Sequence, residues 1–160
     1  GGGVDIIIGS DHQDIIYVDG DKAAESSYDT VAGGNGSDVF VLAKDDFDDI
    51  ENYSLDDTDK SEMDMALDVL LEDEGVQADG VNIVGLIEDW SVSDSVGSDS
   101  LVIAGFDESS TVTVHGEENF AAVLVEEETS NTYTAAILMP EFGVFDADEM
   151  DAINNAVHKI

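Results

Sequence analysis

Aspartates recur at a nine-residue spacing near the start of this chain, and this spacing restricts the fold more than any other sequence feature. Asp5 and Asp14 are nine residues apart, and so are Asp29 and Asp38. A short run of β-prone apolar residues follows each aspartate, and small or polar turn residues precede it. The chain therefore contains two pairs of turn-plus-strand units with the same internal spacing.

The fullest copy of the unit is GGNGSDVFVL at residues 33–42, where three glycines and an aspartate lead into an apolar run. Ordinary hairpin turns are the alternative interpretation, because glycine and aspartate are both common in turns. Hairpins give no reason for the nine-residue spacing to occur twice. The spacing therefore favours a repeated structural unit.

The units resemble the glycine-rich nonapeptide of RTX (hemolysin-type) proteins, G-G-x-G-x-D-x-U-x. In that family the nonapeptides form a parallel β-roll, in which each unit is a half-turn and units two repeats apart stack. The resemblance implies that the turn of Asp14 stacks on that of Asp38, and the turn of Asp5 on that of Asp29. It also implies inward-pointing apolar residues two places after each aspartate, namely Ile7, Ile16, Val31 and Phe40.

Calcium binding is the second implication of the resemblance, because glycine turns expose carbonyl oxygens and the aspartates add carboxylates. Stacked turns would together supply the six or more oxygens that Ca²⁺ prefers. Some acidic residues also stand inside the turns where the family has glycine or asparagine. The expected metal ligands are Asp5, Gly9, Asp11, Asp14, Asp19, Asp21, Asp29, Gly33, Asn35, Gly36 and Asp38.

The charge of the chain excludes several classes of partner. Thirty-nine acidic residues and four lysines give a net charge of −35, so the chain cannot neutralise nucleic-acid phosphates. The acidity suits carboxylates that face salty or extracellular water, some of them holding cations. No apolar run is long enough for a membrane span, and the absence of cysteine excludes disulfides and Cys-based zinc sites.

The rest of the chain predicts a mainly β fold, with a β-roll at 1–43 and a second part at 44–160. That part begins with an acidic connector and a helix over 61–75. Short polar separators favour antiparallel pairing among the next apolar runs, at 82–90, 99–106, 110–116, 120–128 and 132–139. A C-terminal helix capped by Asp146 completes the prediction.

A non-catalytic role is expected, because the three histidines are scattered and neither H-E-x-x-H nor G-x-S-x-G occurs. RTX proteins leave the cell through type I secretion machinery and fold outside it. The resemblance therefore implies a secreted or cell-surface module that binds Ca²⁺ and helps a larger protein to fold. The alternative is an extracellular adhesion domain with structural calcium, whose sheet around Trp90 binds a glycan or a protein ligand.

Overall fold

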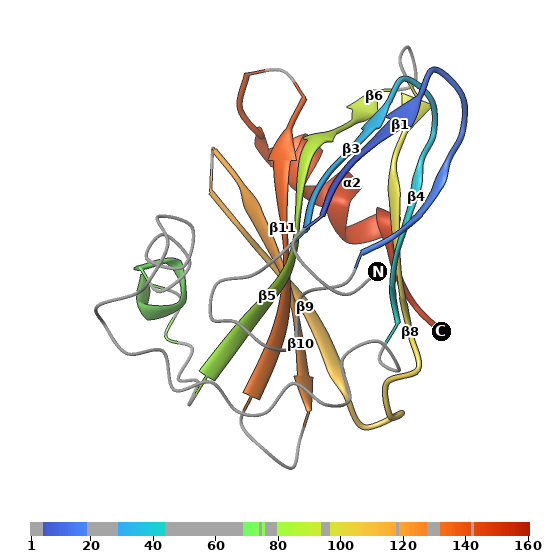
Figure 1. Ribbon diagram of the computed structural model, residues 1–160. Helices are drawn as coiled ribbons and strands as arrows, with labels where there is room; N and C mark the ends of the chain where they lie inside the picture. Colours follow the sequence, from blue (N-terminus) through green and yellow to red (C-terminus); the bar gives the residue numbers. More distant parts are fainter. Residues whose placement is uncertain are drawn as a thin grey trace.

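The computed structural model describes residues 5–18, 29–43, 69–73, 75, 80–93, 97–117, 119–127, 132–141 and 143–160. These parts are mainly β, as predicted, and they form two sheets that face each other (Figure 1). Residues 69–73 are helical, and a second helix lies near the C-terminus.

The larger sheet has six strands in the spatial order β1-β3-β5-β11-β10-β9. Their bounds are Ile6–Ser10 (β1), Asp29–Gly34 (β3), Gly80–Trp90 (β5), Thr132–Pro140 (β11), Ala121–Glu127 (β10) and Thr111–Gly116 (β9). The smaller sheet has the order β12-β8-β4-β2. Its strands are Val157–Lys159 (β12), Ser100–Ala104 (β8), Val39–Ala43 (β4) and Ile15–Tyr17 (β2), and a hairpin joins Val92–Ser93 (β6) to Gly97–Ser98 (β7).

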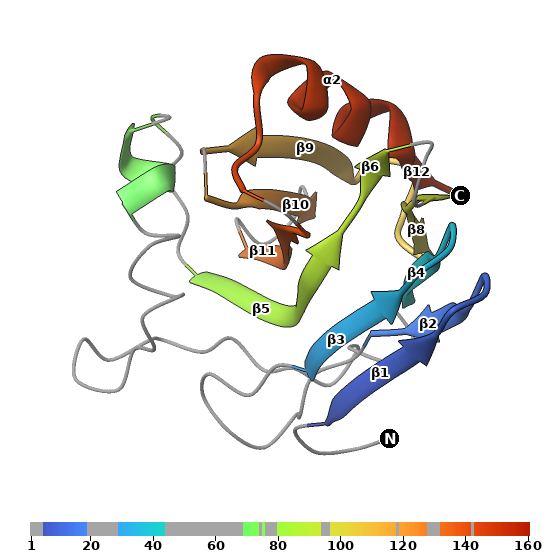
Figure 2. The ribbon, with the colours of Figure 1, turned by 90° about the horizontal axis from the view of Figure 1, so that it is seen from above.

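Strands from the repeat region alternate between the two sheets. β1 and β2 form a first strand pair, β3 and β4 a second, and β5 and β8 a third, each with one strand in each sheet (Figure 2). All neighbours among these strands are parallel. The first and second pairs keep one register in both sheets, because Ile6 pairs with Thr30 and Ile15 with Val39. The three strand pairs therefore lie one upon another.

The core between the two sheets contains the apolar residues that follow the aspartates. Ile16, Val31 and Phe40 are buried, and Ile7 is partly buried against the same cluster, which confirms the predicted inward positions. The Phe40 ring lies 6.0 Å from that of Trp90, which is 1 % exposed. Burial of these large side chains is the main favourable contribution to the packing of the strand pairs.

The expected antiparallel pairing is right for only part of the later strands. β9, β10 and β11 are antiparallel neighbours, as predicted. β5 is instead parallel to both β3 and β11, and β8 is parallel to both β4 and β12. The prediction failed there because β5 and β8 extend edges that β3 and β4 already offer. Both sheets thus continue across the predicted boundary between residues 43 and 44.

The C-terminal helix α2 (Ala147–Ala156) has the predicted cap. The Asp146 carboxylate accepts a hydrogen bond from Glu149 N–H at 2.8 Å, and Ile153 is the residue of the helix that is fully buried. The predicted helix over 61–75 is described at residues 69–73, where Leu70 and Leu71 are buried. Its earlier residues, 61–68, lie outside the described parts.

Lys159 on β12 holds the loop before β9, and its replacement by methionine should destabilise the protein. Its Nζ lies 2.7 Å from the carbonyl oxygens of Asp107 and Ser110, and 3.3 Å from that of Glu108. Loss of these charge-assisted bonds should lower the free energy of unfolding by about 2 kcal/mol in urea denaturation. His158→Gln, at the exposed neighbouring position, is the control; equal stability of both variants would contradict the assignment.

Candidate functional site

Three turn segments meet at one end of the strand pairs and form the candidate site, here named the aspartate corner. It consists of residues 9–14, which link β1 to β2, residues 33–38, which link β3 to β4, and residues 89–93 and 97–99 between β5 and β8. Figure 1 shows these segments side by side near β6. The nine-residue spacing places an aspartate at the end of each of the first two turns.

A ladder of hydrogen bonds runs through the aspartate corner from one strand pair to the next. Asp14 N–H donates to Asp38 Oδ1 at 2.9 Å, and Asp38 N–H donates to Asp99 Oδ1 at 3.0 Å. Within its own turn, Asp99 Oδ2 accepts from Ser91 N–H at 2.7 Å. Asp14 Oδ2 does the same for Ser10, accepting from its N–H at 2.6 Å and its Oγ–H at 2.9 Å. Each carboxylate therefore fixes a turn or joins it to its neighbour.

Glycines in the corner are required by backbone conformation or by lack of space. Gly34 and Gly36 have φ angles of +89° and +133°, which residues with side chains rarely adopt. A Cβ on Gly9 would clash with the carbonyl oxygen of Gly33, and a Cβ on Gly33 would clash with Asp38 Oδ2. The glycine-rich turn thus lets the stacked turns and the carboxylates approach each other closely.

Two carboxyl groups in the corner are almost completely buried: Asp38 is 1 % exposed and Asp99 is 4 % exposed. Burial raises the pKa of the Asp99 carboxyl from 3.8 to about 7, against the opposing effect of the N–H groups of Ser91 and Asp38. Burial also raises the pKa of Asp38, and the charges of Asp14 and Asp89 add to this. Asp38 Oδ2 accepts no hydrogen bond from the described residues.

No lysine or arginine side chain in the described parts offsets these acids. Lys159 is the single lysine in the described parts, and the sequence contains no arginine. The Nζ of Lys159 is bound to the three carbonyl groups beside β9. A buried carboxylate without a partner must take up a proton or gain a cation, because an isolated charge is costly in a low-dielectric interior. The raised pKa values of Asp38 and Asp99 are the response of this corner to that cost.

An open hollow of about 500 Å³ lies on the outer side of the corner. Its lining residues with oxygen groups in their side chains include Asp11, Asn35, Asp89 and Glu141. Asn35 Nδ2 donates to Asp11 Oδ1 at 2.9 Å, which joins the first turn to the second. Carboxylate, amide and backbone oxygens are the donor set of Ca²⁺. In the described parts, however, no three acidic or histidine side chains converge closely enough to hold a metal without rearrangement.

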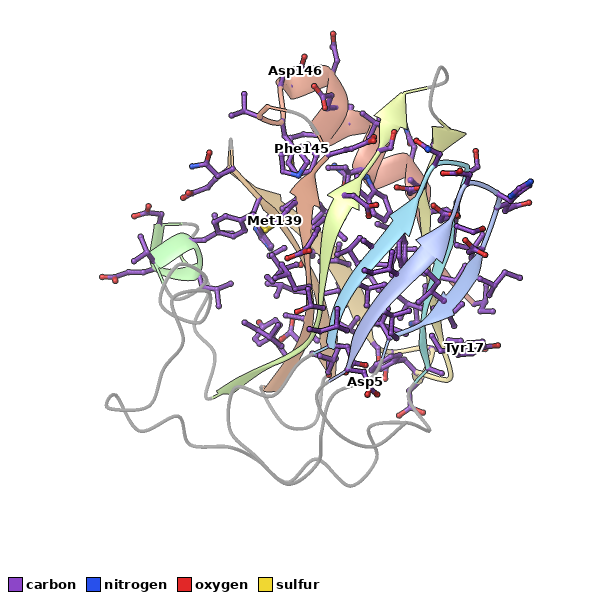
Figure 3. All side chains as sticks on the ribbon, turned by 45° about the horizontal axis from the view of Figure 1, so that its top comes forward. Asp5, Tyr17, Met139, Phe145 and Asp146 are labelled. Carbon is purple, nitrogen blue, oxygen red and sulfur yellow. The ribbon has the colours of Figure 1, made fainter. Side chains whose placement is uncertain are left out.

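The structure brings the predicted site residues together in two groups. Asp11, Asp14, Asp38 and the turn residues Gly9, Gly33, Asn35 and Gly36 lie in the corner. Asp5 lies at the other end of the strands (Figure 3). Its N–H donates there to Asp29 Oδ1 at 2.9 Å. This agrees with the predicted stacking of both turn pairs. Asp19 and Asp21 lie outside the described residues.

Sequence reasoning missed the third turn of the corner, which supplies Asp89 and Asp99. The Asp89 carboxylate accepts from the N–H groups of Gly33 and Gly34, each at 2.9 Å. A signal was present, because GSDSLVIA at 97–104 matches GSDVFVLA at 36–43 in its first three residues and in its apolar pattern. The intervening hairpin and the distance along the chain hide this repeat from a search at nine-residue spacing.

Trp90, the centre of the alternative adhesion hypothesis, has its ring in the core against Phe40 and offers no exposed platform. None of the helical segments in the described ranges has the length and apolar character to cross a bilayer. Comparisons of the chain with protein-family models, curated proteins and solved structures found no match. Function is therefore inferred from the geometry of the corner.

Proposed function

We propose that this protein is a non-catalytic calcium-binding module of the RTX type, whose strand pairs form a short parallel β-roll and whose folding depends on Ca²⁺. The observation that carries the proposal is the aspartate corner. There, three stacked turns bury carboxyl groups that no lysine or arginine side chain in the described residues compensates. A divalent cation at this corner would relieve the repulsion among Asp14, Asp38, Asp89 and Asp99.

The β-roll interpretation is supported by the way in which the strands alternate. A roll built from nine-residue half-turns places successive strands in opposite sheets and stacks each turn on the one two units away. The β1–β3 and β2–β4 registers place units two repeats apart side by side. The hydrogen bonds from Asp5 to Asp29 and from Asp14 to Asp38 join the same units. The third strand pair, β5 and β8, extends the stack.

The net negative charge of the chain supports the proposal that the protein is secreted. At a net charge of −35, carboxylates repel one another in a compact chain, and a shortage of Ca²⁺ therefore favours the unfolded form that type I secretion machinery exports. Outside the cell, abundant Ca²⁺ would convert its binding energy into folding energy. The proposed location is therefore extracellular or on the cell surface, as one part of a larger exported protein.

The hollow beside the corner is the proposed entry and binding position for Ca²⁺. Asp11 and Glu141 lie on its wall, and their side chains hold no backbone group of the ladder in place. Asp89 faces the same space but also accepts from the N–H groups of Gly33 and Gly34. Asp11 and Glu141 are therefore the residues through which calcium affinity can be changed with the least effect on folding.

Calcium should raise the melting temperature of the protein, and the double variant Asp11→Asn/Glu141→Gln should weaken this effect. At one hundred times the dissociation constant, Ca²⁺ should add about 2.7 kcal/mol to the free energy of unfolding. The double variant should bind Ca²⁺ about tenfold more weakly, because two charged oxygen ligands become neutral. Calorimetric titration and thermal melting by circular dichroism measure the two quantities.

The matched control is Asp107→Asn/Asp151→Asn, which removes the same charge at two exposed positions away from the corner. It should keep the calcium affinity of the wild type, apart from a small loss of general attraction. A wild-type protein whose fold and melting temperature do not change in millimolar Ca²⁺ would refute the proposed function. Equal loss of affinity in both double variants would refute the position of the site.

A further inference from the structure

Asn35 lies in the second turn of the aspartate corner, on the wall of the hollow, and its side chain is exposed. Its Nδ2 donates to Asp11 Oδ1 at 2.9 Å, so the amide joins the second turn to the first. This bond needs a donor on Asn35, because the ionised carboxylate of Asp11 can only accept. The junction of these two turns at the hollow therefore depends on one intact amide group.

Asn35 is also the one asparagine in the sequence that a glycine follows. The backbone nitrogen of the residue after an asparagine can attack the side-chain Cγ, and a side chain on that residue obstructs the attack. Gly36 has no Cβ and presents no such obstacle. The other asparagines precede Tyr53, Ile83, Phe120, Thr132, Asn155 and Ala156. The sequence therefore makes Asn35 the asparagine most open to this reaction.

The local structure leaves the reacting groups accessible. Asn35 and Gly36 lie in the turn between β3 and β4, outside the paired strands. Among the described residues, none accepts a hydrogen bond from Gly36 N–H, and the open hollow admits water to the Asn35 side chain. Asn82 and Asn154 differ, because a strand and a helix hold their backbones in regular structure. Structure and sequence thus favour the same position.

We propose that Asn35 and Gly36 form a site of spontaneous deamidation, which changes the contact between the first two turns. The Gly36 nitrogen bonds to Asn35 Cγ, the Cγ–Nδ2 bond breaks, and the proton lost by Gly36 leaves with Nδ2 as ammonia. Water then opens the resulting cyclic imide. Opening at one carbonyl carbon gives aspartate. Opening at the other gives isoaspartate, in which the main chain runs through the former side chain. The reaction requires no oxidant and no cofactor.

Either product breaks the junction between the two turns. In aspartate, a carboxylate oxygen replaces the Nδ2 donor and faces the carboxylate of Asp11, so an attraction becomes a repulsion. In isoaspartate, an extra main-chain atom stands just before Gly36, which leaves no room for a Cβ beside the backbone of His12 and Gln13. A carboxylate at residue 35 also adds a charged oxygen to the hollow.

The effect of deamidation on calcium binding rests on the proposed function. With Ca²⁺ in the hollow, the new carboxylate of the aspartate product would be a further charged ligand. The corner would then be weaker without the ion, and it would bind the ion more tightly. Deamidation would therefore increase the dependence of the fold on Ca²⁺ as the protein ages.

The test follows the full chain in mildly alkaline buffer with Ca²⁺, while circular dichroism shows that it stays folded. Peptide mapping by mass spectrometry should show loss of the Asn35 amide well before that of any other asparagine, together with release of ammonia. Asn35→Gln should release much less ammonia, because the longer side chain must close a larger ring. Asn119→Gln, at an exposed position between β9 and β10, should not change the release. Loss of the Asn35 amide no faster than that of Asn119 would overturn the proposal.

Asn35→Asp reproduces the aspartate product and tests its effect on the corner. In a chelator it should melt about 3 °C below the wild type. Calorimetric titration should show about tenfold tighter binding of Ca²⁺. Asn119→Asp adds the same charge outside the corner and should leave both quantities nearly unchanged. A wild-type melting temperature for Asn35→Asp in chelator would overturn the effect on the junction. If the wild type bound no Ca²⁺, the proposed function would fail, whereas ammonia release and melting in chelator would still test this inference.

Discussion

Replacing Asp99 with alanine is expected to lower the free energy of unfolding by about 4 kcal/mol, because two buried N–H groups lose their acceptor. Asp99 accepts from Ser91 N–H at 2.7 Å and from Asp38 N–H at 3.0 Å, and Ser91 and Asp38 are 6 % and 1 % exposed. Alanine offers no acceptor in its place, and both N–H groups belong to buried residues. Urea denaturation at about pH 5, below the raised pKa of Asp99, measures the change.

Two further variants make this prediction specific to the ladder. Asp99→Asn keeps one acceptor oxygen, so it should lose roughly half as much stability as alanine. Asp151→Ala changes an exposed aspartate on α2 and should stay within about 0.5 kcal/mol of the wild type. If Asp99→Ala unfolded at the same urea concentration as Asp151→Ala, the ladder would not be a source of stability.

Without divalent cations, the protein should be more stable at about pH 5 than at about pH 8, the reverse of ordinary acid denaturation. Burial raises the pKa of Asp99 from 3.8 to about 7, so the folded protein binds a proton that the unfolded chain releases. The stabilisation from this proton is complete below pH 3.8 and is lost as pH rises through 7. The full change from Asp99 is about 4 kcal/mol, and the raised pKa of Asp38 acts in the same direction.

Urea denaturation across this pH range, in the presence of a chelator, tests the expected slope. Asp99→Asn removes the titrating group and should flatten the curve by the contribution of Asp99. Added Ca²⁺ should raise stability more at about pH 8 than at about pH 5, because a cation in the hollow stabilises the ionised forms of the nearby buried carboxyls, which protons neutralise at the lower pH. A wild-type curve that rises steadily toward alkaline pH would show that the buried acids are not neutralised by protons.

The spacing of four aspartates, together with the RTX resemblance that it indicated, was enough to predict how the first strands stack. Asp5 meets Asp29 and Asp14 meets Asp38, because a constant spacing places equivalent residues of successive strand pairs side by side. The same spacing identified three core residues, since side chains alternate along a strand and the second residue after the aspartate points inward. A local pattern was enough here because the contacts are repeated.

Asp99 could not be found in the same way. It lies 61 residues after Asp38, with the acidic connector, a helical segment and a hairpin in between. Asp99 meets Asp38 because β8 pairs with the edge of β4 that remains open. The local sequence does not show which edge that is. The same choice made β5 and β8 parallel, although short separators had favoured antiparallel neighbours. Burial, and with it the shifted pKa, is likewise a property of the packed corner rather than of the local sequence.

The most direct test of the account is a crystal structure of the protein grown with calcium, with the ions located from anomalous scattering. We expect an ion at the aspartate corner, about 2.3–2.6 Å from oxygens that include those of Asp11, Asp89 or Glu141. The ladder from Asp14 through Asp38 to Asp99 should remain in place beside it. A folded corner that holds no ion in abundant calcium would contradict this expectation. So would ions that bind only at other places on the molecule.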